Sequence, residues 1–429
     1  MECRYACGTQ EHSVHRRSFL GGMLGGFGAA ALTGATLGNQ ALAGQLQSQQ
    51  KRILVFFLAG GVSQLETWDP KPGTDTGGPF RAIPTAVPGT HISELLPYSA
   101  QQMQRLSLVR SINTRENSHS KGRYAMEHGR KEEAASKYPH LGSLSARVLT
   151  PEASPLPGYI QITPKGKGAG KDDAAYLGVK YNSMVLADGA PPADIARPAD
   201  LALEADERRN AFRRAASERF LSRRRTAATE AYTYSYDQAA RLMARQEVFD
   251  VTKEPAKDQD RYGGHDFGRH CLLARRLLEH DVSYVQVTHT NYDTHHENFD
   301  FHIEQLGEFD RPFATLIGDL DERGLLDSTL VVVMSEFGRT PKINSRYGRD
   351  HWGTAWSVAL SGAGIQRGAV IGKTNENGTK VADREVDHGN LFHTYLQAVG
   401  VDSTASIDVD GREMPLADPS SAPIGELLA

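Results

Sequence analysis

The stretch that decides the fold is ILVFFLA at Ile53–Ala59, a continuous apolar run that ends at Gly60-Gly61. Further runs of this kind recur along the chain and are short enough for strands. Because they are continuous rather than alternating, they predict strands that are covered on both faces, as in a mostly parallel sheet. These further runs are Leu106–Ile112, Tyr159–Ile162, Val282–Thr288, Thr329–Met334 and Ser357–Leu360.

Helical patterns lie between and after these runs. Apolar residues spaced by three or four predict amphipathic helices over about 265–280 and 297–323, and Leu391–Val399 predicts a last helix. Cys271 falls on the apolar face of the first of these helices, so we expect it in the core. Alternating strands and helices predict an α/β fold: a three-layer sandwich with a central mostly parallel sheet.

Length and charge exclude several classes of protein. The chain has 429 residues and a formal net charge of −4, with 39% hydrophobic and 23% charged residues. A general nucleic-acid binder would show a basic footprint, so no nucleic-acid partner is expected. A single N-terminal apolar stretch excludes a multispanning membrane protein, and we expect no integral membrane span in the mature chain.

The first 43 residues have the three parts of an export signal. Arg16-Arg17-Ser18-Phe19-Leu20 precedes an uncharged Gly/Ala/Leu run that ends in Ala41-Leu42-Ala43. The adjacent arginines indicate the twin-arginine type, which makes that export machinery a partner and the periplasm or the exterior the destination. A membrane anchor that is not cleaved is the alternative. Cleavage would remove Cys3 and Cys7 and leave Cys271 without a disulfide partner.

The remainder, 44–429, is expected to be one domain with a helical insertion at about 201–250. This segment is charged and Ala-rich and contains Arg223-Arg224-Arg225 and a tyrosine run at 232–236. A solvated helix face is the simpler interpretation of such a basic run, and a lid over a cleft is the alternative. Residues 164–173 have the composition of a flexible loop.

Seven of the sixteen histidines fall between His265 and His302, and the sequence NYDTHHEN at 291–298 lies among them. It follows a predicted strand, and the carboxyl ends of parallel strands are where α/β sheets bind ligands. Asp293 and His295 are therefore candidate metal ligands. The alternative is that Asp293 or Thr294 caps a helix that starts near His296.

A second predicted strand ends in SEFGRTP at 335–341. Glu336 is a candidate metal ligand, and the planar guanidinium of Arg339 is a candidate for holding an anionic substrate oxygen. The alternative is a Glu336–Arg339 ion pair that braces the turn.

Two further Asp-His pairs occur. Asp350 and His351 lie in a Gly-flanked loop before the last predicted strand, and both are candidate metal ligands. His388 follows Asp387 at the start of a predicted helix, where Asp387 is better interpreted as an N-cap.

Two N-terminal loops complete the candidates. Ser118, His119 and Ser120 lie near a predicted helix N-terminus, where backbone amides favour an anion and a serine nucleophile would be well placed. An ordinary Ser/Asn cap is the equal alternative. In the loop after the first strand, Glu66 or Asp69 is also a candidate for facing the site.

Acidic and histidine residues thus recur at successive strand ends, and together they predict a metal centre more strongly than any one does. Mixed carboxylate and imidazole ligands without a thiolate suit a divalent ion such as zinc, manganese, iron or calcium.

These motifs together resemble the domain-of-unknown-function family numbered 1501, which is common in planctomycetes and related bacteria and is usually exported by the twin-arginine route. The likeness covers nearly the whole chain. The segments that carry it are Arg16–Leu20, GGVSQLETWDPKP at 60–72, NSHSKG at 117–122, FGRHCLLARRLLE at 267–279, NYDTH at 291–295, SEFGRTP at 335–341 and GRDHW at 348–352.

The family is placed in the alkaline phosphatase and sulfatase superfamily, so the resemblance implies an alkaline phosphatase-like fold and a divalent-metal hydrolase site. It also implies metal ligands at Asp293, His295, Asp350 and His351. The chain departs from the superfamily pattern in three ways: Gly60-Gly61 stands where a metal-binding Asp is usual, Phe337 replaces a usual His, and the sulfatase signature Cys-x-Pro-Ser-Arg is missing. One metal, or an altered pair, fits these departures.

Two functions are compatible with this pattern. The first is an exported metal-dependent hydrolase of phosphate or sulfate esters, acting on a small-molecule or glycan ester through Ser118, Ser120 or water. The second is a non-catalytic binding protein in the periplasm or at the cell surface, which holds a glycan or a partner with a degenerate metal site.

Overall fold

The computed structural model describes residues 49–133, 136–164, 173–192, 200–221, 236, 238–409 and 411–429. The predicted export signal, the arginine run at 223–225 and most of the loop at 164–173 lie outside these residues. Among the described helices, none has both the length and the apolar composition needed to cross a membrane.

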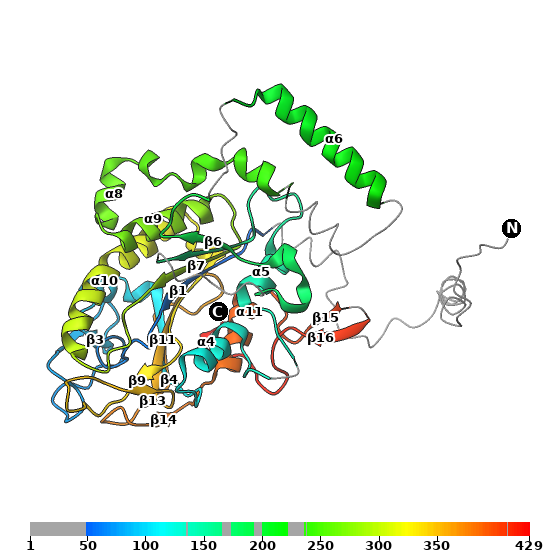
Figure 1. The fold of residues 1–429 in the computed structure, drawn as a ribbon. Coiled ribbons are helices and arrows are strands. Elements are labelled where there is room, and N and C mark those ends of the chain that lie inside the picture. Colours follow the sequence, from blue (N-terminus) through cyan, green and yellow to red (C-terminus); the bar gives the residue numbers. More distant parts are fainter. Residues whose placement is uncertain are drawn as a thin grey trace.

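A central sheet of eight strands forms the middle layer of the molecule (Figure 1). All six predicted strands are confirmed as members of this sheet. In spatial order its strands are β12 (Val370–Ile371), β4 (Leu106–Ile112), β11 (Trp356–Ser361), β8 (Thr329–Met334), β1 (Arg52–Leu58), β7 (Tyr284–His289), β5 (Tyr159–Thr163) and β6 (Met184–Ala187).

Neighbouring strands run parallel at every pairing except the two made by β11, which is antiparallel to β4 and to β8. The predicted mostly parallel sheet is therefore confirmed. The reversal of β11 matters for the site, because the residues that precede β11 reach the edge where the parallel strands end.

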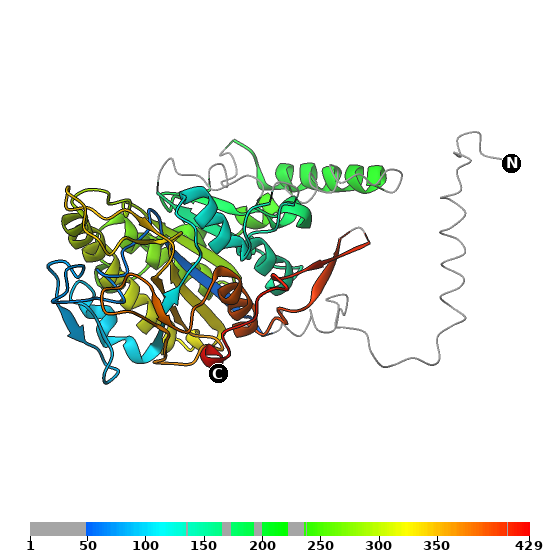
Figure 2. The ribbon, with the colours of Figure 1, turned by 90° about the horizontal axis from the view of Figure 1, so that it is seen from below.

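Helices cover both faces of the sheet, as Figures 1 and 2 show. One face carries α3 (Pro97–Gln101), α8 (Ala256–Tyr262), α9 (Asp266–Glu279) and α10 (Asn298–Glu322). The other face carries α4 (His119–His128), α5 (Leu141–Leu149) and α11 (His388–Ala398). The α/β three-layer sandwich expected from the sequence is thus confirmed.

The side chains of β1 show why this run is continuously apolar. Alternate residues point to opposite faces of a strand, so Phe56 packs on Phe267 and Phe313 of α9 and α10, at ring distances of 6.0 and 5.3 Å. Phe57 belongs to the apolar cluster on the other face. Cys271 is buried in the α9–α10 cluster, as predicted.

Four small hairpins and several 3₁₀ turns complete the fold. The hairpins are β2 (Ala82–Pro84) with β3 (His91–Ser93), β9 (Gly338–Arg339) with β10 (His351–Trp352), β13 (Lys373–Thr374) with β14 (Val381–Asp383), and β15 (Ser406–Val409) with β16 (Arg412–Pro415). The 3₁₀ turns are Met103–Arg105, Ala175–Leu177, Val179–Tyr181, Gln246–Phe249, Val251–Lys253, Leu326–Ser328 and Gly425–Leu427.

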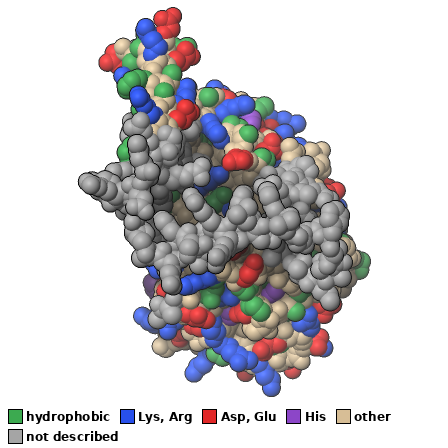
Figure 3. Space-filling view, turned by 90° about the vertical axis from the view of Figure 1, so that its right-hand side faces the viewer, with side chains coloured by type: hydrophobic (Ala, Val, Ile, Leu, Met, Phe, Trp, Pro, Cys, Tyr) green, Lys and Arg blue, Asp and Glu red, His purple; other side chains and the backbone are tan. Residues whose placement is uncertain are grey.

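The helix α6 (Leu203–Leu221) lies in the region where a helical insertion is predicted. It stands away from the sheet and from β9 (Figure 1). Phe212 of this helix is 77% exposed. In the view of Figure 3, acidic and basic side chains are intermixed on the part of the molecule that protrudes at the top. In this arrangement α6 is a solvated helix and does not cover the edge of the sheet near β9.

Candidate metal centre

Three segments far apart in the sequence meet at one edge of the sheet. His119 begins α4 after the carboxyl end of β4, and Asp293 follows the carboxyl end of β7. His351 lies in β10, before β11, and reaches the same edge because β11 runs in the opposite direction. Ligand atoms of these three residues lie within 4.8 Å of one another.

Asp293 is the centre of this group. Its Oδ2 lies 3.3 Å from His119 Nε2, and its Oδ1 lies 3.2 Å from both His351 Nε2 and His295 Nε2. The Nε2 atoms of His295 and His351 are 2.9 Å apart. Three imidazoles therefore present the same ring nitrogen to one carboxylate.

The other ring nitrogen of each imidazole is held by an oxygen. His119 Nδ1 is 2.7 Å from Glu336 Oε1, His295 Nδ1 is 2.6 Å from Asp350 Oδ1, and His351 Nδ1 is 2.7 Å from the carbonyl oxygen of Asn117. Oxygens of this kind accept, so each Nδ1 carries the proton and donates it. In the neutral ring this leaves the Nε2 lone pair facing Asp293.

This donor set fits a divalent cation. Lone pairs of Nε2 atoms and carboxylate oxygens that face one another at 2.9–3.3 Å repel unless a proton or a cation lies among them. Ligands about 2.0–2.1 Å from a tetrahedral zinc ion stand roughly 3.3 Å apart. Histidine ligands whose Nδ1 donates to a carboxylate or a carbonyl are also the usual arrangement around metals in proteins.

The surroundings shift the pKa values of the three residues in different directions. The hydrogen bond to Glu336 raises the pKa of His119, whereas burial lowers the pKa of His351. Burial of Asp293 opposes ionisation and is the largest single effect, but the hydrogen bond and charge of Arg339, the hydrogen bond from His351 and the charge of His119 together outweigh it and lower the pKa of Asp293 to about 2. Asp293 is therefore an anion at every physiological pH, as a metal ligand needs to be.

Glu336 and Asp350 lie behind two of the histidines. Glu336 is 4% exposed, and its oxygens accept from His119 Nδ1, from Ser335 Oγ at 2.9 Å and from the Gly60 amide at 2.9 Å. Asp350 accepts from His295 Nδ1. Both carboxylates contact the Nδ1 atom of a histidine, on the side of the ring away from the converging Nε2 atoms, and so orient the histidine from behind.

Arg339 lies behind Asp293, away from solvent. Its guanidinium is fully buried and donates to the carbonyls of Gly60, Gly61 and Arg349 and, at 2.6 Å, to Asp293 Oδ1. A buried guanidinium whose N–H groups already donate to these acceptors cannot bind a substrate oxygen that comes from solvent. Its carboxylate partner is Asp293, so the alternative of a Glu336–Arg339 pair is wrong as well.

Ser118 and Ser120 flank His119, and both are exposed. Their hydroxyl oxygens are 3.4 Å apart, and Ser118 precedes α4 without a side-chain capping bond. The capping alternative is therefore wrong for Ser118. Within the described residues no hydrogen bond links either hydroxyl to the histidine cluster.

Two other capping interpretations have opposite outcomes. The helix α10 begins at Asn298 after Glu297, which makes no side-chain capping bond, so neither Asp293 nor Thr294 is its cap. Asp387 does cap α11: its side chain accepts from the Asn390 amide at 2.9 Å in a capping box. The N-cap preferred for Asp387 is confirmed.

Two of the three departures from the superfamily pattern, Gly60-Gly61 and Phe337, lie beside the cluster. A Cβ on Gly60 would lie 2.4 Å from the Asp293 amide nitrogen, and one on Gly61 would lie 2.5 Å from the Phe337 ring. That ring packs against His119 and His351, at 5.0 and 4.4 Å between centroids. Backbone and a phenyl ring thus occupy this side, and the described residues form one candidate metal group.

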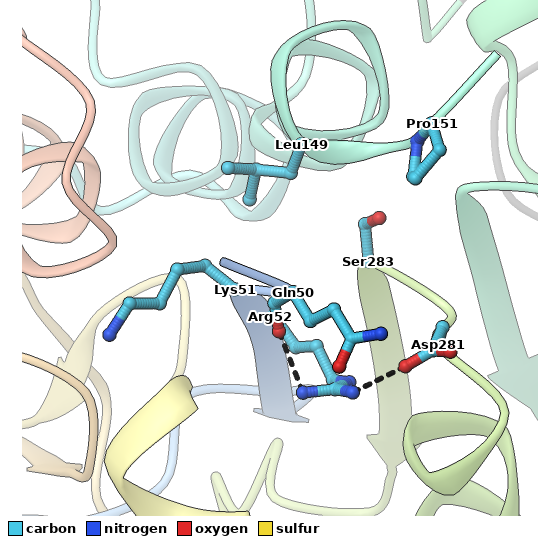
Figure 4. Close-up of a pocket in the computed structure, with 7 residues that line it drawn as sticks. All are labelled: Gln50, Lys51, Arg52, Leu149, Pro151, Asp281 and Ser283. Atoms are coloured by element: carbon cyan, nitrogen blue, oxygen red, sulfur yellow. Dashed lines mark hydrogen bonds and ion pairs between the residues drawn. The ribbon is translucent and has the colours of Figure 1, made fainter. Parts of the chain in front are cut away.

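A pocket of about 120 Å³ lies at the opposite edge of the sheet (Figure 4). It surrounds the amino ends of β1 and β7, where Arg52 reaches Asp281 at 2.5 Å. The cluster is therefore not part of this cavity. Its lining residues are Gln50, Lys51, Arg52, Leu149, Pro151, Asp281 and Ser283.

Three residues of the region lie differently from what the sequence predicts. His119 was expected among catalytic residues, yet its Nε2 makes it a candidate ligand. Glu66 does not face the cluster but forms a fully buried pair with Arg349, at 2.9 Å. Asp69 likewise turns away, to Lys71 at 2.9 Å. His119 follows the strand that ends at Ile112 and the segment NTRENS at 113–118, so the strand-end argument that found Asp293 could have found it as a ligand.

Fold and site together define the class of this protein: an α/β sandwich with a histidine–carboxylate candidate metal centre at the carboxyl edge of a mostly parallel sheet. The chain belongs to the family described as protein of unknown function DUF1501, whose model matches residues 50–428. No curated protein matches the chain.

Solved structures with a similar arrangement include three enzymes. The PsFucS1 sulfatase from a Pseudoalteromonas species aligns at 12% identity over 92% of this chain and 76% of its own, with a TM-score of 0.42. The lipoteichoic acid synthase LtaP from Listeria monocytogenes aligns at 7% identity over 87% of this chain and 82% of its own, with a TM-score of 0.38. Alkaline phosphatase from the Antarctic bacterium TAB5 aligns at 14% identity over 81% of this chain and 98% of its own, with a TM-score of 0.35. At TM-scores below 0.5, these alignments assign neither activity nor substrate to this chain.

Proposed function

We propose that this protein is a metal-dependent hydrolase of phosphate or sulfate esters that is exported by the twin-arginine route. The observation that carries the proposal is the convergence of three imidazole Nε2 atoms on Asp293, with every Nδ1 held by an oxygen. The export part rests on the Arg16–Leu20 motif alone and makes the periplasm or the exterior the proposed location.

A divalent ion at this site would polarise an ester oxygen and favour ionisation of a nucleophile. His119, Asp293 and His351 would hold it, with His295 adjacent. Zinc, manganese or iron suits this donor set better than calcium, because imidazole nitrogen outnumbers carboxylate oxygen.

The chain supplies donors for the anionic part of the substrate beside the ion. The first turn of α4 begins at His119 and carries no side-chain cap, so its amide N–H groups can attract an oxyanion. Ser118 and Ser120 are exposed on the same turn, where either hydroxyl, or a water molecule, would attack the ester.

A double variant, Asp293→Ala with His351→Ala, tests the metal centre. Elemental analysis of the exported protein should find metal in the wild type and none in the double variant. His296→Ala is the matched control, because His296 is an exposed imidazole next to His295. Metal retained in full by the double variant would overturn the assignment.

Hydrolysis is tested with aryl phosphate and aryl sulfate esters after the metal has been restored. Turnover of either ester that disappears in Ser118→Ala or Ser120→Ala would also identify the nucleophile, and turnover kept by both would indicate water.

One observation favours the second function, a non-catalytic binding protein for a glycan or partner. Phe337 packs on two of the three candidate ligands, and neither serine hydroxyl contacts the cluster. Metal binding without turnover of any ester would support this function over the hydrolase.

A further inference from the structure

A second arginine stands near the cluster, on the helix that carries His119. Arg123 follows His119 by four residues in α4, so both side chains lie on the same side of the helix. Arg123 turns its Nε to Glu127, one turn further along the helix, and its guanidinium lies close enough to Glu336, the carboxylate behind His119, to feel its charge. The helix lies close to the strand ends here: a Cβ on Gly122 would be 2.6 Å from the Glu336 carbonyl oxygen.

The guanidinium of Arg123 is held from one edge. Its Nε lies 3.0 Å from both carboxylate oxygens of Glu127, and its Cζ lies 4.9 Å from the centre of the Phe57 ring. Glu127 is itself buried and accepts from Gln286 Nε2 at 3.0 Å. The contacts to the Glu127 carboxylate and to the face of the Phe57 ring thus fix the orientation of the Arg123 guanidinium.

The opposite edge of the fork is free. Within the described part of the chain, neither Nη1 nor Nη2 of Arg123 makes a hydrogen bond, and the side chain is 38% exposed. The two other arginines of the region, Arg339 and Arg349, have fully buried side chains that donate to backbone carbonyls. Arg123 is therefore the guanidinium beside the cluster whose terminal nitrogens face solvent.

We infer that Arg123 binds the non-bridging oxygens of a phosphate or sulfate monoester at the metal centre; this inference rests on the proposed function. Two N–H groups on one edge of a guanidinium match two oxygens of a tetrahedral anion. The sequence suggested Arg339 for binding an anionic substrate oxygen. We assign this role to Arg123, because its terminal nitrogens are accessible whereas the Arg339 side chain is fully buried.

The experiment measures the affinity of the metal-loaded, exported protein for orthophosphate and for sulfate by calorimetry. Arg123→Gln should weaken binding roughly 10- to 100-fold, as expected for loss of a charge-assisted pair, with metal content unchanged. Arg123→Lys should restore only part of the affinity, because it returns the charge without the fork. Lys121→Gln is the matched control: Lys121 is an exposed cation on the same helix, two residues from His119.

Loss of Arg123 leaves the buried Glu127 without its counter-charge, so the double variant Arg123→Gln with Glu127→Gln is measured in parallel. It should fold and bind the anions as weakly as the single variant. Wild-type affinity in Arg123→Gln, or in the double variant, would overturn the inference while the hydrolase proposal stands. Wild-type protein that binds metal but neither anion would overturn both.

Discussion

Arg339 and Asp293 form an ion pair 2.6 Å long in which the arginine is fully buried and the aspartate side chain is 47% exposed. The asymmetry has a structural meaning. Arg339 is anchored to the carbonyls of Gly60, Gly61 and Arg349, and it holds the one carboxylate on which the imidazoles converge. The arginine thus links the first strand-end loop to the candidate ligand.

Arg339→Lys is expected to lower metal affinity by roughly 10- to 100-fold, because an ammonium group cannot hold three carbonyls and Asp293 together. Metal titration of the purified variant measures the change. Arg346→Lys, at an exposed arginine in the neighbouring loop, should leave the affinity unaltered. If Arg339→Lys keeps its metal and raises only the substrate KM, Arg339 contacts substrate after all.

Glu336→Ala should weaken metal binding more than Asp350→Ala does. Each carboxylate holds the Nδ1 of one histidine, but the Glu336 side chain is 5% exposed and that of Asp350 is 55% exposed. Water can replace the exposed acceptor and not the buried one, so about 10- to 100-fold is expected for Glu336. Competition with a chelator ranks the two variants, and an equal loss would contradict the prediction.

Acid should destabilise the fold through His302. Its Nδ1 donates to the Asn298 carbonyl at 2.8 Å and its Nε2 accepts from the Ser63 amide at 3.2 Å, so the folded state needs the neutral ring. Burial lowers the pKa of His302 to about 4 from an ordinary value of 6.5. Between these values the unfolded chain binds more protons, so stability is full above pH 6.5 and falls as the pH drops toward 4.

The loss due to this histidine should approach about 1.4 kcal/mol per pH unit. Urea unfolding at several pH values measures the slope, and His302→Gln should reduce it. His296→Gln, at an exposed histidine, is the control. A slope that is the same in His302→Gln and in the wild type would show that His302 is not the group that titrates.

The buried pair of Glu66 and Arg349 should give a large coupling energy. Both side chains are 0% exposed, and Arg349 also donates to the carbonyls of Thr76 and Thr340. Removing one partner, as in Glu66→Gln or Arg349→Met, should cost about 3–5 kcal/mol of unfolding free energy because the other charge stays buried.

The double variant should cost less than the two single variants together, and a double-mutant cycle from urea unfolding gives the difference. The exposed pair of Arg384 and Glu426, with side chains 36% and 53% exposed, is the control and should couple by about 0–1 kcal/mol. Additive losses for Glu66 and Arg349 would mean that the pair is not a unit.

The strands could be predicted because their physical signal is local. A strand covered on both faces needs a continuous apolar run, and Ile53–Ala59 and Thr329–Met334 have one. Asp293 and His351 could be nominated for a similar reason, since polar residues at strand ends gather at one edge of a sheet. The direction of β11 could not be predicted from its own residues. Whether a strand runs parallel or antiparallel to its neighbours depends on how the chain connects the strands, not on the apolar run itself.

The assignment of roles within the site could not be predicted. Glu336 and Arg339 are polar residues at a strand end, as Asp293 is, but both are buried and bonded to neighbours far away in the chain, such as Gly60, 276 and 279 positions away. Whether a carboxylate faces the Nε2 atoms or the Nδ1 side of a histidine depends on how the strand-end turns pack together, which composition does not encode.

The sequence by itself determined the α/β class, the strands, the buried position of Cys271 and the Asp387 cap. It also placed the histidine-rich segment at the end of a strand. Each of these follows from apolar periodicity or from a local backbone requirement. Only the tertiary structure decided that His119 joins Asp293 and His351, that Arg339 is buried, and that Arg123 has an open fork. Those outcomes depend on distances between residues far apart in the chain, which are set when the sheet and its helices pack together.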